Sequence, residues 1–480
     1  MVFSSVFFTF LFLPIVLGGY YVTRNDRIKN LILLVASLFF YAYGEPKFIY
    51  VMLGSIVTNY VFALLIDKEL KEKRKNGAKA FLVLDILANL GLLFVFKYLC
   101  FTMEIFQSVS GRAFRIPEIT LPIGISFFTF QAMSYVFDVY RGGAEVQKNP
   151  LHLALYISFF PQLIAGPIVR YRKIADEIDH KRNISPEYFA YGCERFMTGF
   201  CKKVILANNL AGITDETFSF LDFAAAGHGC LYYWIGAIAY SLQIFFDFSG
   251  YSDMAIGLGA MFGFHFDENF NYPYMCSSVT DFWRRWHISL SGWFRDYVYI
   301  PLGGSRKGAG RQIFNMAVVW LCTGLWHGAD YQFIAWGMSY LIFLILEKYV
   351  VKPENRKDIV KRTWQMITLC VVVVNWVLFR SVGIRQGMDY IRAIFGGYQM
   401  YATGMDTDVI RMLRDHMPYL ILGIVFATPV AKRIREKLTA SPKYTAVCGI
   451  VVPLGLFLAF LWAVSFLVMG AHNPFIYFNF

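Results

Sequence analysis

The sequence is poor in charge, and its cysteines form no recognisable pattern. Asp, Glu, Lys and Arg make up 16% of the 480 residues, whereas a soluble protein carries about a quarter. The eight cysteines are scattered and include no C-x-x-C pair, which argues against a disulfide framework and against a zinc or other metal site. The chain also lacks an internal repeat, a low-complexity tract and a Pro/Ser-rich linker. These absences disfavour a soluble or disulfide-linked protein and predict one domain over residues 1–480.

The sequence contains several long apolar runs with few charged residues. Hydrophobic residues make up 57% of the chain, and five runs hold one charge or none. These runs are 2–22, 48–66, 81–96, 363–379 and 447–468. Each approaches or reaches the ~20 residues with which a helix crosses a bilayer, so we expect an all-α, polytopic transmembrane protein. The first run lacks a positive start and is followed at once by further spans, which argues against a cleaved signal peptide.

The formal net charge is +12, and the basic residues gather in short segments between the apolar runs. Short cytoplasmic loops of membrane proteins accumulate Lys and Arg, so this charge indicates membrane topology and not a nucleic-acid partner. Residues 24–29 and 68–79 are basic and flank a neutral turn at 43–47, which places the N-terminus outside.

A single apolar stretch, 151–169, separates two basic segments, 141–148 and 170–182. The stretch contains PQLIAGPIV, whose prolines and glycine disfavour a continuous helix. A helix broken in this way can enter and leave on the same side, and irregular backbone is tolerated at membrane depth where protein or water covers it. We therefore expect re-entrant or broken helices around a central passage.

Polar residues inside apolar runs are costly and mark candidate sites. Asp247 and Asp253, together with Ser249 and Ser252, interrupt a hydrophobic region. One interpretation is that they line a polar passage or position a base. The other is that they cap or kink a helix and pair with an arginine from the next segment.

A second group of polar residues lies in DFWRRWHISLS, which begins at Asp281. If this stretch is one helix, Asp281 and Arg285 form an ion pair one turn apart, while Trp283, His287 and Ser291 share another face. Tryptophan is typical of the membrane interface. We expect His287 on an interfacial helix near cations, in either a structural or a functional role.

The third group surrounds His327 in WLCTGLWHGAD. The flanks of 313–346 are both basic, so this segment is predicted to be a hairpin with His327 near its turn. A helix from residue 313 to His327 rises roughly 21 Å, which lies within a hydrocarbon core about 30 Å thick. A histidine at that depth either transfers protons, as imidazole does near neutral pH, or satisfies a neighbouring polar group.

Six motifs follow one another along the chain. They are LPIGISFFTFQAMSYVFDVYRG from Leu121, FFPQLIAGPIVR from Phe159, FFDFSGYSDMAIGLGAMFG from Phe245, NFNYPY from Asn269, DFWRRWHISLSGWFRDYVYIPLGG from Asp281 and LWHGADYQFIAWG from Leu325. The chain then ends with NPFIYFNF, and the match that these motifs carry covers most of the chain. This ordered set resembles the membrane-bound O-acyltransferase superfamily and, within it, the bacterial alginate O-acetylation branch.

The resemblance implies acyl transfer and two catalytic histidines. His327 matches the hallmark histidine of the family, and His287 matches its second characteristic polar position. Acyl transfer to a hydroxyl needs a base for the proton and a donor for the developing oxyanion. We assign the base to His327, while His287 either orients the thioester carbonyl or stabilises charge.

Polar and aromatic residues of the same motifs are candidates for substrate binding. They are Trp283, Arg284, Arg285, Trp286, Ser291, Asp247, Asp253 and Trp326. The cations Arg284, Arg285, Arg306, Lys307 and Arg311 either hold an anionic phosphopantetheine or coenzyme A head group or only follow the positive-inside bias.

The expected activity is O-acetylation of an extracytoplasmic polysaccharide by a multi-pass protein of the bacterial cytoplasmic membrane. No bound cofactor is expected. The donor substrate is an acyl thioester, either acetyl-CoA or carrier-protein phosphopantetheine, and a secreted or membrane-anchored acetyltransferase is the expected partner. Three alternatives stay open: D-alanyl transfer to teichoic acids from a carrier protein, a transporter that uses the buried ionisable residues, and a scaffold that only recruits another enzyme.

Overall fold

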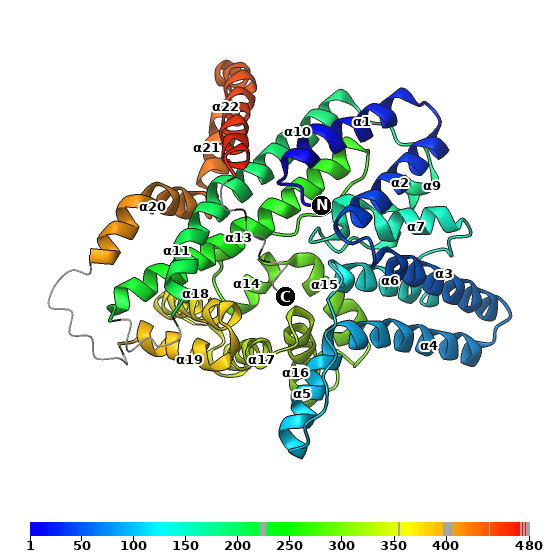
Figure 1. Cartoon of the computed structure of the whole chain (residues 1–480), viewed down its shortest axis with the longest axis horizontal. Helices are drawn as coiled ribbons and strands as arrows, with labels where there is room; N and C mark the ends of the chain where they lie inside the picture. The colour runs from blue at the N-terminus through cyan, green and yellow to red at the C-terminus, as the bar shows by residue number, and fades with distance from the viewer. Residues whose placement is uncertain are drawn as a thin grey trace. The chain divides into compact units, whose positions relative to one another are not determined.

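A computed structural model describes residues 1–220, 227–353, 356–396, 407–440, 442–470, 473 and 476 (Figure 1). Helices connected by loops make up these residues, and they include no strand. The chain divides into two compact units, each discontinuous in sequence. Unit 1 comprises Met1–Phe196 and Ser252–Glu268, and unit 2 comprises Met197–Tyr251 and Asn269–Phe480.

Most of the apolar runs form helices of membrane-spanning length. Within the described residues six helical segments are long and apolar enough to cross a bilayer: Asp26–Gly44, Ile49–Lys71, Lys75–Ser110, Tyr331–Val351, Asp358–Arg380 and Val447–Val468. A seventh candidate is Thr407–Phe426 with Val430–Thr439, which meet at a bend of 61°. The first run is helical only over the shorter Phe8–Val22. The prediction of a polytopic helical membrane protein is thus confirmed.

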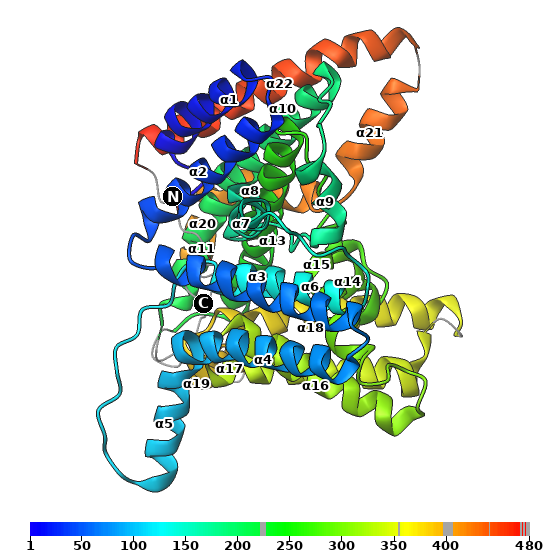
Figure 2. The same ribbon diagram turned by 90° about the vertical axis from the view of Figure 1, so that its right-hand side faces the viewer.

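Unit 1 begins the chain. Its elements are η1 (Phe8–Phe12), α1 (Leu13–Val22), α2 (Asp26–Gly44), α3 (Ile49–Lys71), α4 (Lys75–Leu93), η2 (Phe94–Tyr98), α5 (Leu99–Ser110), α6 (Ile125–Tyr140), α7 (Pro150–Ser158), α8 (Phe160–Leu163), α9 (Tyr171–Asp179) and most of α10 (Pro186–Cys201). Helices α3 and α4 lie side by side (Figures 1 and 2). Buried Asn59 and Asn89 exchange side-chain hydrogen bonds of 3.2 and 3.1 Å across this pair, as polar residues do between membrane helices.

The predicted break in 151–169 is present. Helix α7 ends at Ser158, α8 ends at Leu163, and the backbone is irregular from Ile164 to Arg170. Protein covers this segment: Phe160 N donates to Ser37 Oγ at 3.1 Å, and Gln162 Nε2 donates to the Tyr156 carbonyl at 2.6 Å. Irregular backbone at membrane depth needs such internal partners.

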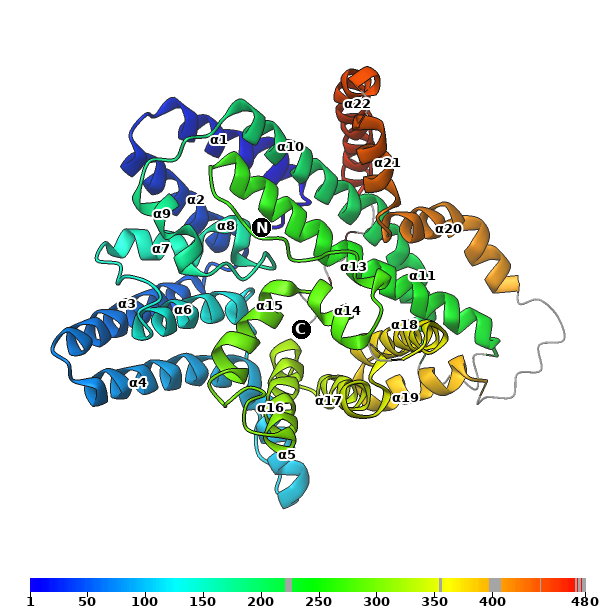
Figure 3. The same cartoon turned by 180° about the vertical axis from the view of Figure 1, so that it is seen from behind.

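Unit 2 holds the remaining helices (Figure 3). They are η3 (Lys202–Ala207), α11 (Asn208–Phe218), α13 (Cys230–Met261, whose last residues belong to unit 1), η4 (Pro273–Met275), α14 (Val279–Arg285), α15 (Ile288–Phe294), η5 (Arg295–Tyr299), α16 (Ala309–His327), α17 (Tyr331–Ile345), η6 (Leu346–Val351), α18 (Asp358–Arg380), α19 (Gly383–Ile394), α20 (Thr407–Phe426), α21 (Val430–Thr439) and α22 (Pro442–Val468).

Helices α16 and α17 form the predicted hairpin, and two glycines allow them to touch. A Cβ on Gly337 would lie 2.5 Å from the Trp320 carbonyl oxygen, and a Cβ on Gly324 would lie 2.5 Å from that of Phe333. Real side chains do not approach backbone so closely, so only glycine fits at either position. The close approach fixes the turn, and His327 is the last residue of α16.

We expect Gly337→Ala to destabilise the protein, because its methyl group forces the two helices apart. Overpacking of this kind costs about 1–3 kcal/mol. The measurement is thermal unfolding of the detergent-solubilised protein. Gly54→Ala is the matched control, since Gly54 lies inside α3 and a Cβ there meets nothing within 4 Å. A melting temperature for Gly337→Ala equal to that of Gly54→Ala would contradict the argument.

Candidate active site

The stretch from Asp281 to Ser291 is two helices and not one. The ion pair between Asp281 and Arg285 forms as predicted, at 2.9 Å, but α14 ends at Arg285 and α15 begins at Ile288. His287 lies in the break, with left-handed φ and ψ of 45° and 55°. The expectation that Trp283, His287 and Ser291 share one helical face is therefore wrong.

The break has a physical cause in a distant segment. Asn271 N donates to the Arg285 carbonyl at 2.9 Å, and Ile288 N donates to the Asn269 carbonyl at 3.0 Å. These bonds replace the helical bonds that a continuous α14–α15 would make. They offset the left-handed conformation of His287, which costs a residue with a Cβ about 1–2 kcal/mol.

The side chain of Asn269 sets the tautomer of His287. Asn269 Oδ1 accepts hydrogen bonds from the Ser289 N–H at 3.1 Å and from Ser289 Oγ at 2.9 Å, so this atom must be the oxygen. The same oxygen lies 3.3 Å from His287 Nδ1. An acceptor at that position places the proton on Nδ1 and leaves the lone pair on Nε2.

His287 is 3% exposed and lies outside the candidate membrane-spanning segments. Burial lowers the pKa of its imidazole to about 3, because the charged form loses its hydration. The ring is therefore neutral at physiological pH.

One indole ring contacts both histidines. The centroid of Trp326 lies 5.9 Å from that of His287 and 4.9 Å from that of His327, edge-on in each case. His327 is 5% exposed, and its ring also meets Trp336 at 5.0 Å and Phe379 at 5.1 Å. The structure thus gathers the two sequence-predicted catalytic residues around Trp326 in one buried aromatic cluster.

The predicted substrate-binding residues Trp283 of α14 and Trp286, which directly follows that helix, belong to this cluster. Trp283 packs edge-on against Trp320 at 4.8 Å and Tyr340 at 4.9 Å. Trp286 packs against Trp376 at 4.8 Å. Both are buried, and their contacts tie α14 to α16, α17 and α18.

A buried carboxylate that sequence reasoning missed holds α14 in place. Glu347, at 5% exposure, accepts hydrogen bonds from the Val279 N–H at 2.7 Å, the Thr280 N–H at 3.1 Å and Trp364 Nε1 at 2.9 Å. The first two are N–H groups of the first turn of α14, which lack partners within the helix. A negative charge at a helix N-terminus is also favourable.

The other predicted binding residues of this stretch lie at the edge of the cluster. Arg284 is exposed and Arg285 is half-buried beside Asp281. Ser291 is half-buried in α15, and its N–H donates to the His287 carbonyl at 3.1 Å. The cations of α14 therefore stand apart from the buried histidines.

The two aspartates of α13 are ion-paired. Asp247 meets Lys203 at 2.6 Å, with both side chains buried, and also accepts from the Ile476 N–H at 3.0 Å. Asp253 meets Arg195 at 2.7 Å, in unit 1. Helix α13 is continuous through both positions, so neither caps nor breaks it. Asp253 thus pairs with an arginine as expected, whereas Asp247 pairs with a lysine, and both cations come from segments before α13 and not from the next one.

The roles of Asn269 and Glu347 could be predicted from the sequence only in part. Asn269 opens the motif NFNYPY, which sequence reasoning quoted without assigning its residues a role. Glu347 stands at the end of an apolar run beside Lys348, where it reads as an ordinary flanking charge. Nothing local to the sequence indicates that it caps a helix 68 residues earlier.

Known proteins resemble this chain over most of its length. The membrane-bound O-acyltransferase family matches residues 125–381. The probable alginate O-acetylase of Pseudomonas aeruginosa is 43% identical over 399 residues, which are 82% of this chain and 75% of that protein. That of Pseudomonas putida is 38% identical over 500 residues, with all of both chains covered. The peptidoglycan O-acetyltransferase of Helicobacter pylori is 34% identical over 468 residues, 90% of this chain and 87% of that protein.

We expect Glu347→Ala to lower stability, because two backbone N–H groups and one indole N–H lose their acceptor. Each buried, unsatisfied group costs about 1–3 kcal/mol. Thermal unfolding in detergent is the measurement, with exposed Glu104→Ala of α5 as the control. Glu347→Gln keeps one acceptor oxygen and should fall between Glu347→Ala and the unchanged protein. Equal melting temperatures for Glu347→Ala and Glu104→Ala would refute the capping role.

Proposed function

Because this chain belongs to the membrane-bound O-acyltransferase family and is therefore an acyltransferase, we propose that it acetylates an extracytoplasmic polysaccharide from a cytoplasmic thioester. The observation that carries the proposal is the pair His287 and His327 around the single indole of Trp326. The relatives support the acyl group and the acceptor class, since their names specify O-acetylation of alginate or peptidoglycan. We further propose that residues 1–480 act as one catalytic domain.

In the proposed reaction His327 is the general base. It takes the proton of the acceptor hydroxyl as the hydroxyl oxygen attacks the thioester carbonyl carbon. The carbon–sulfur bond breaks, the acetyl group stays on the oxygen, and His327 returns the proton to the leaving thiolate. The buried aromatic surroundings exclude water, which would otherwise hydrolyse the thioester.

The tautomer of His287 supports a role different from the two that the sequence left open. Orienting a carbonyl and stabilising an oxyanion both require a hydrogen-bond donor. The Nδ1 proton of His287 is directed to Asn269, so Nε2 presents a lone pair. We propose that Nε2 accepts a hydrogen bond from a donor group of the substrate other than the reacting hydroxyl, whose single proton goes to His327, and so orients the substrate for attack.

The acceptor hydroxyl belongs either to the polysaccharide or to a partner protein that passes the acetyl group on. A secreted or membrane-anchored acetyltransferase is the proposed partner, and the cytoplasmic membrane of a bacterium is the proposed location. Basic segments mark the cytoplasmic side, which is where acetyl thioesters are made, whereas the polysaccharides named for the relatives are extracytoplasmic. The buried histidines would then act between the two compartments.

We expect His327→Ala to lower acetyl transfer by about 100-fold or more, since general-base catalysis contributes about 10²–10⁴-fold. The measurement is labelled acetyl transfer in proteoliposomes with the thioester donor sealed on one side. His180→Ala, at an exposed position of unit 1, is the control and should transfer normally. Both variants are compared by thermal unfolding. A folded His327→Ala protein with an unchanged transfer rate would remove the proposed base.

A further inference from the structure

A pocket of about 370 Å³ opens in unit 2 beside the backbone that supports His287. Its walls include Tyr272, Arg285, Lys432, Arg433 and Glu436. Tyr272 and Arg285 come from the catalytic motifs, whereas the other three come from α21, outside the segment 125–381 that matches the family. The volume falls in the range of about 300–1,000 Å³ that is typical of small-molecule sites.

The pocket connects to the candidate active site through two short backbone segments. Asn271 also lines the pocket, and its N–H donates to the Arg285 carbonyl at 2.9 Å. Two residues earlier, Asn269 contacts His287. Tyr272 adopts a left-handed φ of 44°, which only a constrained backbone imposes on a residue with a Cβ. One wall of the pocket and His287 are therefore held by the same backbone segment.

Arginine dominates the charge of this pocket. Asp281 binds Nε of Arg285, and no described residue accepts from the two terminal nitrogens of that guanidinium. Lys432 and Glu436 pair at 4.0 Å, with both side chains about two-thirds exposed, so their attraction is weak. Arg433 has no ion-pair partner within the part of the chain that the structure describes.

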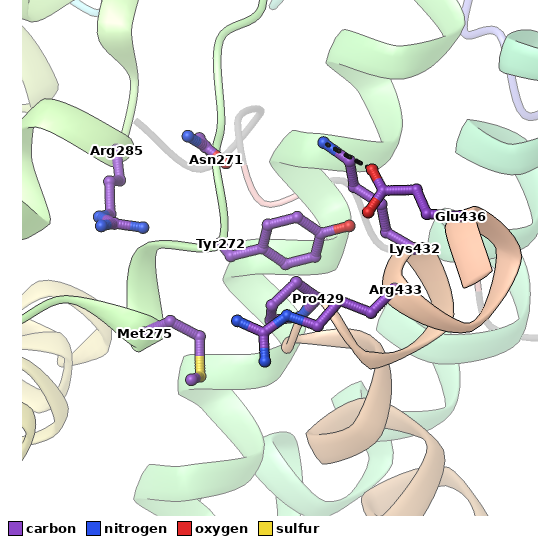
Figure 4. Close-up of a pocket in the computed structure, with 8 residues that line it drawn as sticks. All are labelled: Asn271, Tyr272, Met275, Arg285, Pro429, Lys432, Arg433 and Glu436. Atoms are coloured by element: carbon purple, nitrogen blue, oxygen red, sulfur yellow. Dashed lines mark ion pairs between the residues drawn. The ribbon is translucent and has the colours of Figure 1, made fainter. Parts of the chain in front are cut away.

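Figure 4 shows how these side chains lie. Lys432 and Glu436 meet on one side of the Tyr272 ring, and the guanidinium of Arg433 extends from α21 on the other side, toward Met275 and Arg285. Two guanidinium groups, those of Arg285 and Arg433, therefore border one pocket. Guanidinium is the protein cation whose planar donors best match phosphate oxygens.

The cations of α21 indicate the cytoplasmic side. Helix α21 follows the 61° bend after α20 and carries Lys432, Arg433, Arg435 and Lys437. Clusters of Lys and Arg at the end of a membrane span mark the cytoplasmic face. Phosphate esters available there are the phosphopantetheine arm of a thioester carrier and the head groups of anionic phospholipids.

We propose that this pocket binds a phosphate ester at the cytoplasmic face, through Arg285 and Arg433, beside the segment that holds His287. Where the bound phosphate belongs to the acyl donor, this inference rests on the proposed acetyl transfer. A phosphate held there would place a flexible thioester arm next to the buried histidine cluster. Because α21 lies beyond the family match, this part of the site is a feature of the chain's C-terminal region.

The experiment measures equilibrium binding of three probes to the full-length protein in detergent: coenzyme A, 4′-phosphopantetheine and short-chain phosphatidylglycerol. Arg433→Gln is the test variant. Arg435→Gln is the matched control, since Arg435 is an exposed arginine of the same helix that does not line the pocket. Losing one charge-assisted hydrogen-bond donor should raise the dissociation constant about tenfold or more, and Arg435→Gln should bind as the unchanged protein does.

If Arg433→Gln, but not Arg435→Gln, binds coenzyme A or phosphopantetheine more weakly than the unchanged protein does, the acyl donor is supported as the source of the phosphate. Weakened phosphatidylglycerol binding alone supports a lipid head group. If no probe binds the unchanged protein, or if Arg433→Gln and Arg435→Gln bind alike, the pocket is not a phosphate site. Binding needs no turnover, so His327→Ala should keep it, and failure of the acetyl-transfer proposal is thereby distinguishable.

Discussion

The close contact of α16 with α17 is the constraint on which the candidate site depends. Gly324 and Gly337 let the two backbones approach within a distance that excludes any Cβ. This approach determines where α16 must stop, and His327 stands at that end with Trp326 directly before it. Any residue that spread the helices would move the indole that contacts both histidines. Packing of backbone against backbone is thus what sets the position of His327 at the end of α16.

His287 is positioned by the opposite means, through hydrogen bonds to segments distant in sequence. The 269–271 segment supplies backbone bonds on both sides of the break, and Asn269 adds the contact that fixes the tautomer. Glu347 anchors the start of α14 from η6, which directly follows α17, and Trp364 of α18 binds the same carboxylate. One carboxylate therefore joins the three elements that enclose the aromatic cluster. The orientation of His287 is a property of this network and not of its own helix.

The structural features that depend on periodicity and local charge were predicted from the sequence. The apolar runs, the break within 151–169, the α16–α17 hairpin and the Asp281–Arg285 pair all follow from spacing along the chain, and all are present. The break at His287 could not be predicted, because DFWRRWHISLS contains neither proline nor glycine. Its cause lies in hydrogen bonds to the 269–271 segment, which precedes the bonded residues by 14 to 19 positions. Glu347 was missed for the same reason, since its partners are distant in sequence.

The distribution of charge in unit 2 separates two chemical environments. The histidines lie in an aromatic cluster where burial keeps His287 neutral, and a neutral imidazole is the form that accepts a proton. A guanidinium inside that cluster would be costly to bury without a partner and would oppose protonation of His327 during the reaction. Arg284 is instead exposed, and Arg285 is held at the edge by Asp281. A donor with an anionic phosphate and an uncharged thioester matches this division, because each end of the molecule meets the environment that its own charge requires.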